Sequence, residues 1–184
     1  MTWVSKYLRQ LADSCATAVN EYSTIKTLVI GLGNPILTDD GAGILAARLV
    51  AEQLPPDSSV DVVELAVGGL SLMEAMVDYE RVILLDALYA PDGKPGQVVQ
   101  FSAGELPETL NSTSAHDVNL PTALRLGRDL GATLPSTTAI QVVGVYAQEV
   151  LTFGDTPTPP VAAAIPEMAG LVLRLLETKN DDFS

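Results

Sequence analysis

The segment 81–86, Arg-Val-Ile-Leu-Leu-Asp, is apolar at every position between its two charged ends. A strand that shows one face to water alternates apolar and polar residues, whereas a strand without this alternation is buried on both faces. The segment Thr27–Gly33 has the same apolar character and runs into a glycine turn. Both segments therefore predict inner strands of a parallel sheet that is covered by helices on both sides.

The residues between and after these two segments alternate strand and helix patterns. Ile44, Ala47, Ala51 and Leu54 recur at helical spacing and end at Pro55-Pro56, which predicts a helix. Further strands are predicted at 60–65, 97–101 and 139–146, and further helices at 71–78, 118–130 and 160–178. This order predicts one three-layer α/β/α domain with a mostly parallel, twisted sheet, over residues 26–178.

Residues 1–25 precede this core and are expected to form a helical arm. Apolar side chains recur there at roughly helical spacing, namely Trp3, Tyr7, Leu11, Val19 and Tyr22. Such a stripe usually packs on its own domain or on a neighbouring subunit. The arm has charged residues and no apolar run typical of a signal peptide, so the cytoplasm is the expected location.

The composition narrows the classes of partner. The formal net charge is −13 and the sequence pI is about 4.2, so the surface repels phosphate backbones and anionic lipid heads. Mean hydropathy is +0.27, and no apolar run approaches the ~20 residues of a membrane span. Cys15 is the only cysteine, which excludes an internal disulfide and a cysteine-rich metal site. We expect no nucleic acid and no membrane partner.

Chemistry in an open α/β sheet gathers beyond the carboxyl ends of its strands. Asp39 and Asp40 follow the first strand, Asp86 ends the third strand, and His116 lies in a polar segment, 111–117, before a helix. Carboxylates and an imidazole from separate loops suit a divalent metal. They suit general acid–base catalysis equally well.

Each of these residues also has a simpler interpretation. Asp39 or Asp40 could cap the helix that begins near Gly41, although capping needs only one of them. Asp86 could satisfy neighbouring backbone N–H groups at the end of a buried strand. His116 is the only histidine in the chain, and a single loop histidine is most often a surface residue.

Several familiar active sites are excluded by inspection. Gly31-Leu-Gly33 resembles the start of a dinucleotide fingerprint, but Ile36 stands at the third glycine position. Asp39 and Asp40 would also repel a pyrophosphate at the helix N-terminus. There is no GxxxxGK[ST] phosphate loop and no G-x-S-x-G nucleophile elbow. A nucleotide enzyme and a serine hydrolase therefore fit poorly.

The segment Gly31–Gly43, Gly-Leu-Gly-Asn-Pro-Ile-Leu-Thr-Asp-Asp-Gly-Ala-Gly, resembles the GxGNxLxxDDGxG opening of the hydrogenase maturation endopeptidases. The similarity continues through Val82–Ala87, the Ser114-Ala-His116 segment and Val142–Val145, and covers roughly Leu28 to Leu176 in matching order. The family's fold is a three-layer α/β/α domain of the phosphorylase/hydrolase-like kind.

The resemblance implies roles for individual residues. Asp40, Asp86 and His116 match the family's acidic residue, strand-end acid and loop histidine, which coordinate a metal that marks the nickel site. The family removes the C-terminal extension of a nickel-iron hydrogenase large-subunit precursor after nickel insertion, and recognises nickel that the substrate carries. No tightly bound cofactor of the enzyme itself is then expected. Nickel accepts imidazole and carboxylate ligands together.

The same resemblance assigns substrate-facing loops. Many members have a D-x-G-T loop after the second strand that helps to choose the hydrogenase, whereas this chain has Glu64-Leu-Ala-Val-Gly68-Gly69. We assign Glu64, Gly68 and Gly69 to that loop, and Asn34 and Asp39 to the loop after the first strand.

The chemical step and two other functions stay open at this stage. Either nickel polarises the scissile carbonyl or positions water, or Asp40 or Asp86 acts as a general base in the manner of an acid protease. A peptidyl-tRNA hydrolase also opens with Gly-Leu-Gly-Asn-Pro, but it would next need a Thr-Arg-His-Asn element, and this chain has Asp39-Asp40-Gly41-Ala42. A non-enzymatic α/β adaptor would make the loop acids dispensable.

Overall fold

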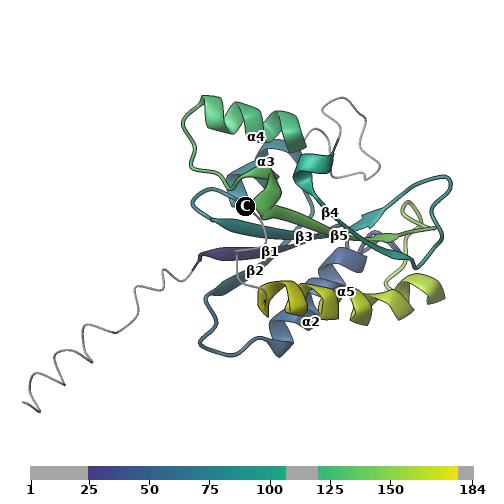
Figure 1. Ribbon diagram of the computed structural model, residues 1–184. Helices are drawn as coiled ribbons and strands as arrows, with labels where there is room; N and C mark the ends of the chain where they lie inside the picture. Colours follow the sequence, from purple (N-terminus) through teal and green to yellow (C-terminus); the bar gives the residue numbers. More distant parts are fainter. Residues whose placement is uncertain (1–24, 107–119, 178–184) are drawn as a thin grey trace, which may run out of the picture.

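The computed structural model describes residues 25–106 and 120–177 and shows a single sheet between two layers of helices (Figure 1). The strand order is β2-β1-β3-β5-β4, and the first four of these strands run parallel while β4 runs antiparallel to β5. The strands are β1 (Thr27–Leu32), β2 (Val60–Leu65), β3 (Arg81–Leu88), β4 (Val98–Ser102) and β5 (Ile140–Tyr146). The predicted mostly parallel sheet is confirmed.

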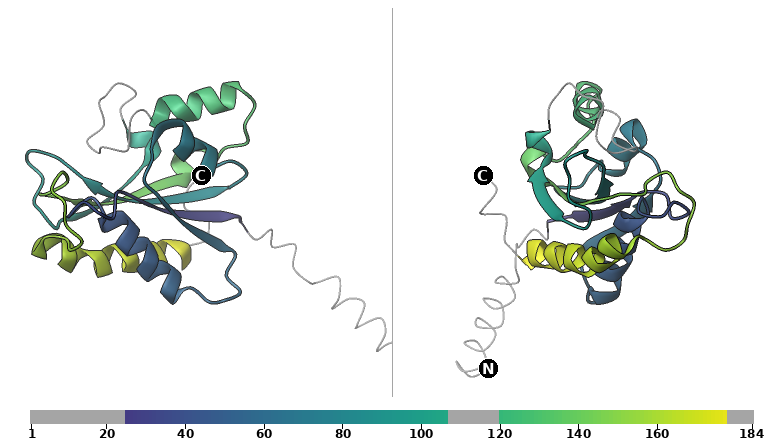
Figure 2. Two further views of the ribbon diagram at one scale, coloured as in Figure 1. Left: turned by 180° about the vertical axis from the view of Figure 1, so that it is seen from behind. Right: turned by 90° about the vertical axis from the view of Figure 1, so that its right-hand side faces the viewer.

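The helices divide between the two faces of the sheet. On one face α2 (Ala42–Gln53) packs against α5 (Pro159–Glu177), and on the other α3 (Gly69–Ala75) packs against α4 (Leu120–Asp129). The end-on view in Figure 2 shows the sheet between these two pairs. Short 3-10 turns, η1 (Ala103–Glu105) and η2 (Thr137–Ala139), lead out of β4 and into β5. The three-layer α/β/α prediction is therefore confirmed.

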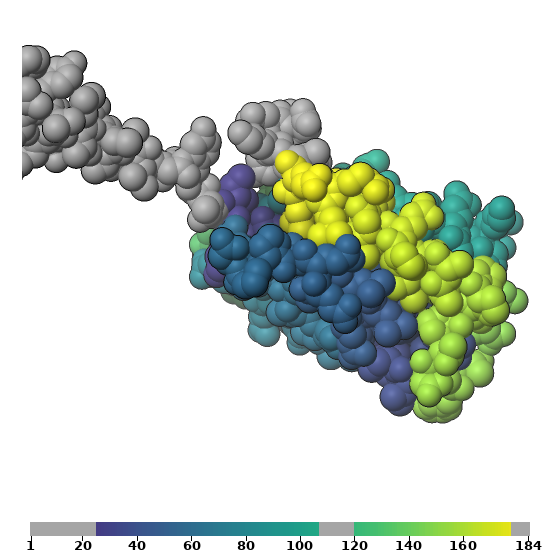
Figure 3. All heavy atoms as spheres, turned by 90° about the horizontal axis from the view of Figure 1, so that it is seen from below, coloured from purple at the N-terminus to yellow at the C-terminus, as the bar shows by residue number. Residues whose placement is uncertain are grey.

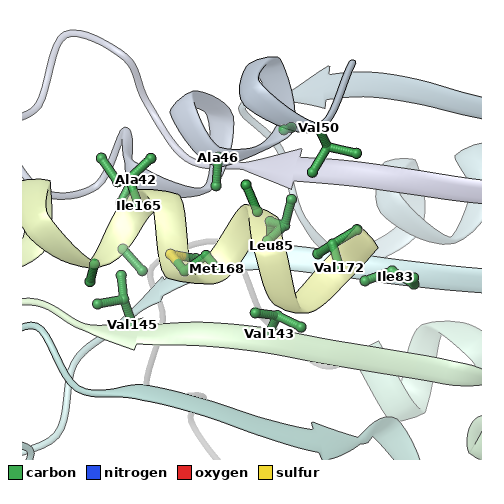
Figure 4. Packing of buried hydrophobic residues seen from close by; sticks show 14 of the residues in the cluster. Ala42, Ala46, Val50, Ile83, Leu85, Val143, Val145, Ile165, Met168 and Val172 are labelled. Atoms are coloured by element: carbon green, nitrogen blue, oxygen red, sulfur yellow. The ribbon is translucent and has the colours of Figure 1, made fainter. Parts of the chain in front are cut away.

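Each face of the sheet has its own apolar core. In the core between the sheet and the α2–α5 pair, Met168 and Val172 of α5 lie over Val143 of β5 and Leu85 of β3 (Figure 4). The opposite core joins the α3–α4 pair to the same strands, through Leu72, Leu84 and Leu124 among others. Every residue of β1 and β3 is buried, as their apolar sequences predict.

The ends of the elements differ from the prediction in a few places. Helix α3 begins at Gly69, two residues earlier than expected, and ends at Ala75. It ends early because residues 76–78 form a turn in which Asp78 has a φ of 63° and donates its N–H to the carbonyl of Thr133. In α2 the buried face includes Ala46 and Val50, and Ala51 is exposed rather than part of that face. The helical arm expected at 1–25 lies outside the described residues, except for Ile25.

Helix α5 is the one described helix that is long and apolar enough to cross a membrane by length and composition. Seven of its residues are buried against the sheet and α2, and a helix that helps to form a protein core passes the same test. Pro166 lies on its exposed side. At the far end, the guanidinium of buried Arg81 donates to the carbonyl of Leu175, and burial lowers the pKa of Arg81.

The strand order creates a switch point between β1 and β3. From β1 the chain crosses to β2 on one side, and it then returns to β3 on the other side. The loops that leave β1 and β3 therefore separate at their carboxyl ends, which is where open α/β sheets bind ligands. In Figure 1 this edge lies at the right-hand end of the sheet.

Candidate active site

Two glycines of the segment Gly31–Gly43 allow α2 to lie close against the sheet. A Cβ at Gly31 would lie 2.7 Å from the Cβ of Ala47 in α2. A Cβ at Gly43, in the first turn of α2, would overlap the carbonyl oxygens of Leu85 in β3 and Leu32 in β1. The start of α2 therefore rests directly on the carboxyl ends of β1 and β3, at the switch point.

Gly33 makes the sharp turn that leads out of β1. Its φ is 131°, and its N–H donates to the carbonyl of Leu65 at the end of β2. A Cβ at Gly33 would overlap the carbonyl oxygen of Asp40. The loop after β1 thus folds back on itself, and it brings Asp40 against the first residues of the loop.

Asp40 is buried and fixed by this loop. Its Oδ2 accepts a hydrogen bond of 2.7 Å from the backbone N–H of Asn34, six residues earlier. The side chain of Asn34 is used locally, since its Oδ1 accepts from the N–H of Ile36 at 3.2 Å. Asn34, which was assigned to a substrate-facing loop, therefore shapes the turn that holds Asp40.

Asp86 is a buried carboxylate inside β3. The pairing of β3 with β1 ends at Leu85 and Gly31, whereas β3 and β5 remain paired through Asp86 and Gly144 as far as Leu88 and Tyr146. Asp86 is thus the first residue of β3 beyond its pairing with β1. Its Oδ1 accepts from the N–H of Ala87 at 2.8 Å, which is the local backbone role considered from the sequence.

Asp40 and Asp86 come to the same edge of the sheet through Gly43. Asp40 lies three residues before Gly43, and Asp86 lies one residue after Leu85, whose carbonyl Gly43 packs against. Both carboxylates are buried at the switch point of a parallel sheet. Carboxylates in this position can act as anionic metal ligands or as general bases.

Asp39 points elsewhere and is fully buried. Its carboxylate accepts hydrogen bonds from the N–H groups of Gln148, Glu149 and Thr158 at 3.0, 2.9 and 2.7 Å, and from the Thr158 hydroxyl at 3.1 Å. These donors belong to the segment between β5 and α5. A substrate contact was expected for Asp39, but the structure gives it the role of joining two loops.

The carboxylate of Asp39 does not cap α2, because its hydrogen bonds go to the segment between β5 and α5. The N-cap of α2 is Gly41, and no side chain makes a cap hydrogen bond there. The N–H of Ala42 instead donates to the backbone carbonyl of Asp39. The capping alternative is therefore wrong for the side chain of Asp39.

The loop after β2 is fixed at its start by an ion pair. Arg48 of α2 donates two hydrogen bonds of 2.8 Å, one to each carboxylate oxygen of Glu64. The hydrogen bond from Arg48 is the main reason that the pKa of Glu64 lies below its usual range.

The two glycines of this loop lie at the start of α3. Gly68 is the N-cap of α3, and Gly69 begins the helix with a φ of 60°. Both glycines thus shape the entry into α3.

His116 lies outside the described residues, so its place relative to Asp40 and Asp86 stays a prediction. Within residues 25–106 and 120–177, no group of three histidine, cysteine, aspartate or glutamate side chains could hold a metal ion. The predicted trio needs His116 to be complete. The two carboxylates are the part of the trio that the structure describes.

A pocket of about 560 Å³ lies beside α4 and both 3-10 turns, and its described walls contain none of the candidate residues. Those walls include Thr122, Arg125, Arg128 and Thr137. Thr158, which binds Asp39, is a structural residue of this region that the sequence did not predict. Nothing near Thr158 in the sequence indicates its role, because its partner Asp39 lies 119 residues away.

The fold and the two buried carboxylates define an α/β protein with an acidic site at a topological switch point. Comparison with known proteins narrows this class. The family described as hydrogenase maturation protease matches residues 44–175, a range that includes Asp86 and His116 and begins directly after Gly43. The chain belongs to the hydrogenase maturation protease family, and it is therefore placed among peptidases.

Relatives and solved structures agree with this assignment. The hydrogenase 2 maturation protease of Escherichia coli is 24% identical over 135 residues, which are 73% of this chain and 81% of the relative. The solved structure of the E. coli hydrogenase maturating endopeptidase HybD has a TM-score of 0.70 at 27% identity, covering 82% of this chain and 91% of that chain. The [NiFe] hydrogenase maturation protease HybD of Thermococcus kodakarensis has a TM-score of 0.66 at 26% identity, covering 83% and 99%.

Proposed function

We propose that this protein is the endopeptidase that removes the C-terminal extension of a nickel-iron hydrogenase large-subunit precursor after nickel insertion. The observation that carries the proposal is the pair of buried carboxylates, Asp40 and Asp86, at the switch point of a hydrogenase maturation protease fold. The relative from T. kodakarensis is described as a [NiFe] hydrogenase maturation protease, which supports a nickel-iron hydrogenase as the partner.

The substrate's own nickel is the proposed recognition element. Asp40, Asp86 and His116 would complete the coordination of a nickel ion that the precursor brings to the site. Nickel takes carboxylate and imidazole ligands together, so this donor set suits it. The carboxylate of Asp40 is held by the N–H of Asn34, and the position of Asp86 is set by β3. Both ligands are thus oriented before the substrate arrives.

Two routes for peptide hydrolysis are compatible with this arrangement. In one, the substrate's nickel polarises the scissile carbonyl or positions the attacking water. In the other, Asp40 or Asp86 takes a proton from that water as a general base. In the first route both carboxylates serve as metal ligands, whereas in the second only the carboxylate that acts as the base accepts a proton. The match to the protease family excludes the peptidyl-tRNA hydrolase alternative, and the net charge of −13 also argues against a tRNA ligand.

We also propose the cytoplasm as the location. A chain with a single cysteine forms no internal disulfide and needs no oxidising environment.

The test compares Asp40→Asn and His116→Ala with the wild-type protein on nickel-loaded and nickel-free precursor. Tail removal is followed by mass spectrometry, and thermal unfolding is followed in parallel. We expect both variants to unfold near the wild-type temperature and to lose trimming of the nickel-loaded precursor. The wild-type protein should leave the nickel-free precursor uncut at any enzyme concentration.

Three results would contradict the proposal. Full trimming by both variants would favour the adaptor alternative, in which the loop acids are dispensable. Efficient trimming of nickel-free precursor would remove nickel as the recognition element. A strong anomalous scattering peak in crystals soaked with nickel or cadmium, located away from Asp40 and Asp86, would place the metal site elsewhere.

A further inference from the structure

Three large apolar side chains are exposed in the two loops that Asp39 joins. Ile36 lies in the loop after β1 and is 57% exposed, and Leu151 and Phe153 lie in the segment after β5 and are 81% and 78% exposed. We call these three residues the apolar rim. Large apolar side chains that gather on a protein surface mark sites of interaction with other proteins more often than scattered ones do.

The apolar rim has a rigid backbone beneath it. Leu37 and Phe153 form an antiparallel bridge, and the N–H of Gly154 donates to the carbonyl of Ile36 at 3.1 Å. The N–H and the hydroxyl of Thr38 both donate to the carbonyl of Thr152, at 2.9 and 2.7 Å. The next residue, Asp39, is buried. Its carboxylate accepts hydrogen bonds from the backbone N–H groups of Gln148 and Thr158, at the two ends of the segment between β5 and α5. Figure 3 shows the segments after β1 and after β5 side by side at one end of the molecule.

The rim adjoins the candidate active site. Thr38 carries the main-chain link to the rim, and Asp40 follows it by two residues in the same loop. Ile36 and Asp40 belong to the same short loop, so a protein substrate that places a peptide bond at Asp40 can also contact Ile36 and the bridged segment. Because the two loops are already fixed to each other, binding there costs little ordering of the enzyme.

The charges within the two segments that carry the rim indicate the chemistry of its occupant. Neither Leu32–Ala47 nor Ala147–Leu173, the segments that carry the rim, contains a lysine or an arginine. Glu149 and Asp155 are exposed beside Leu151 and Phe153 in the sequence. An apolar surface with acidic neighbours complements an apolar surface with basic neighbours.

We propose that the apolar rim is the docking surface for an apolar segment of the hydrogenase large-subunit precursor that carries lysine or arginine beside it. This inference rests on the proposed function and adds a contact that lies outside the site of cleavage. Residues at the centre of a protein interface, where water is excluded, carry most of the binding free energy. Leu151 and Phe153 are the residues with the most apolar surface to bury there.

The experiment measures kcat and KM for trimming of nickel-loaded precursor by the full-length protein and by Leu151→Ser and Phe153→Ser. Burying one such side chain is worth about tenfold or more in affinity, so each variant should raise KM about tenfold and leave kcat unchanged. Both side chains are exposed, and the unfolding temperature should therefore stay at the wild-type value. Leu130→Ser is the matched control, because Leu130 is 77% exposed and lies away from the rim. It follows α4 and precedes the start of β5, whereas the rim segment follows the end of β5.

Asp155→Asn tests the charge of the surface. It should raise KM at low ionic strength, and added salt should remove the difference from wild type, since salt screens exposed charges. An unchanged KM at low ionic strength would overturn the basic character of the occupant.

The outcomes separate the docking surface from the proposed function. If the wild-type protein does not trim the precursor, the proposed function fails before any variant is compared. If it does trim, and Leu151→Ser and Phe153→Ser keep the wild-type KM, the docking surface is overturned while the function stands. A wild-type dimer that these variants convert to monomers without a change in KM would assign the rim to a second copy of the chain instead.

Discussion

The carboxylate of Asp39 accepts two hydrogen bonds from Thr158, one from its backbone N–H at 2.7 Å and one from its hydroxyl at 3.1 Å. Thr158 directly precedes α5 and lies 119 residues after Asp39. The neighbouring Asp40 instead accepts from Asn34 within its own loop. Two adjacent aspartates thus have different structural roles, one joining distant loops and one lying at the candidate active site.

Replacement of Asp39 by asparagine should destabilise the fold. Each carboxylate oxygen of Asp39 accepts at least one backbone N–H, and the amide NH₂ of asparagine would place a donor against one of them. We expect a loss of about 2–4 kcal/mol in the free energy of unfolding, because a buried donor loses a charged acceptor. Chemical denaturation measures this loss. Asp155→Asn is the control, since Asp155 is exposed in the segment between β5 and α5. Wild-type stability of Asp39→Asn would refute the role of Asp39 in joining the two loops.

Much of the fold could be predicted from the sequence because its signals are local. β2 spans 60–65 as predicted, and the uninterrupted apolar character of β1 and β3 predicted their burial on both faces. The antiparallel direction of β4 could not be predicted, because it depends on the course of the chain between β3 and β4 rather than on the residues of the strand.

The candidate site was predicted less completely for the same physical reason. The rule that polar residues at strand ends meet at one edge of the sheet points to Asp39, Asp40 and Asp86 together, and the choice of Asp40 came from the family resemblance. The partners of Asp39 lie 109 to 119 residues away, so no local pattern separates this aspartate from Asp40. Glu64 was assigned to the substrate loop by its position after the second strand, and that position does not reveal its ion pair with Arg48, sixteen residues earlier on α2.

The ion pair between Arg48 and Glu64 should contribute a small stability that is lost in acid. The pKa of Glu64 is lower in the folded protein than its usual value of about 4.3, so the pair stabilises the fold above that pH and loses its effect as the pH falls through the folded pKa. The side chains of Arg48 and Glu64 are 50% and 41% exposed, and the contribution should stay below about 1 kcal/mol.

Glu64→Gln and Arg48→Met should therefore lose the same small stability at neutral pH, measured by urea unfolding at several pH values. In acid below the folded pKa of Glu64, the difference from wild type should disappear for both variants. A loss confined to one of the two variants would show that the pair itself is not the cause.

Gly33→Ala should damage the site loop much more than Gly131→Ala. Both glycines have positive φ values, 131° and 87°, so both variants carry the cost of an unfavourable backbone conformation, about 1–2 kcal/mol. A Cβ at Gly131 meets no atom within 4 Å, whereas a Cβ at Gly33 overlaps the carbonyl oxygen of Asp40. Thermal unfolding should show at least twice the loss for Gly33→Ala, together with loss of trimming. Equal losses in the two variants would mean that the loop can move aside.

Gly43→Ala tests whether close packing of α2 on the sheet sets the position of Asp40. Alanine is the better helix former by about 1 kcal/mol, so Gly170→Ala in α5 should stabilise the protein, because its Cβ meets only the end of Arg174 at 3.5 Å. At Gly43 the Cβ overlaps the carbonyl oxygens of Leu85 and Leu32, and backbone atoms move aside far less easily than a long side chain. We expect Gly43→Ala to cost about 1–3 kcal/mol despite its better helix propensity.

The same substitution should reduce trimming by more than its effect on stability explains. When α2 is pushed from the ends of β1 and β3, Asp40 moves with it, while Asp86 remains in β3. At a temperature where circular dichroism shows Gly43→Ala to be fully folded, kcat should fall well below wild type, and Gly170→Ala should keep wild-type kcat. A folded Gly43→Ala protein with full activity would show that the separation of Asp40 and Asp86 does not depend on this contact.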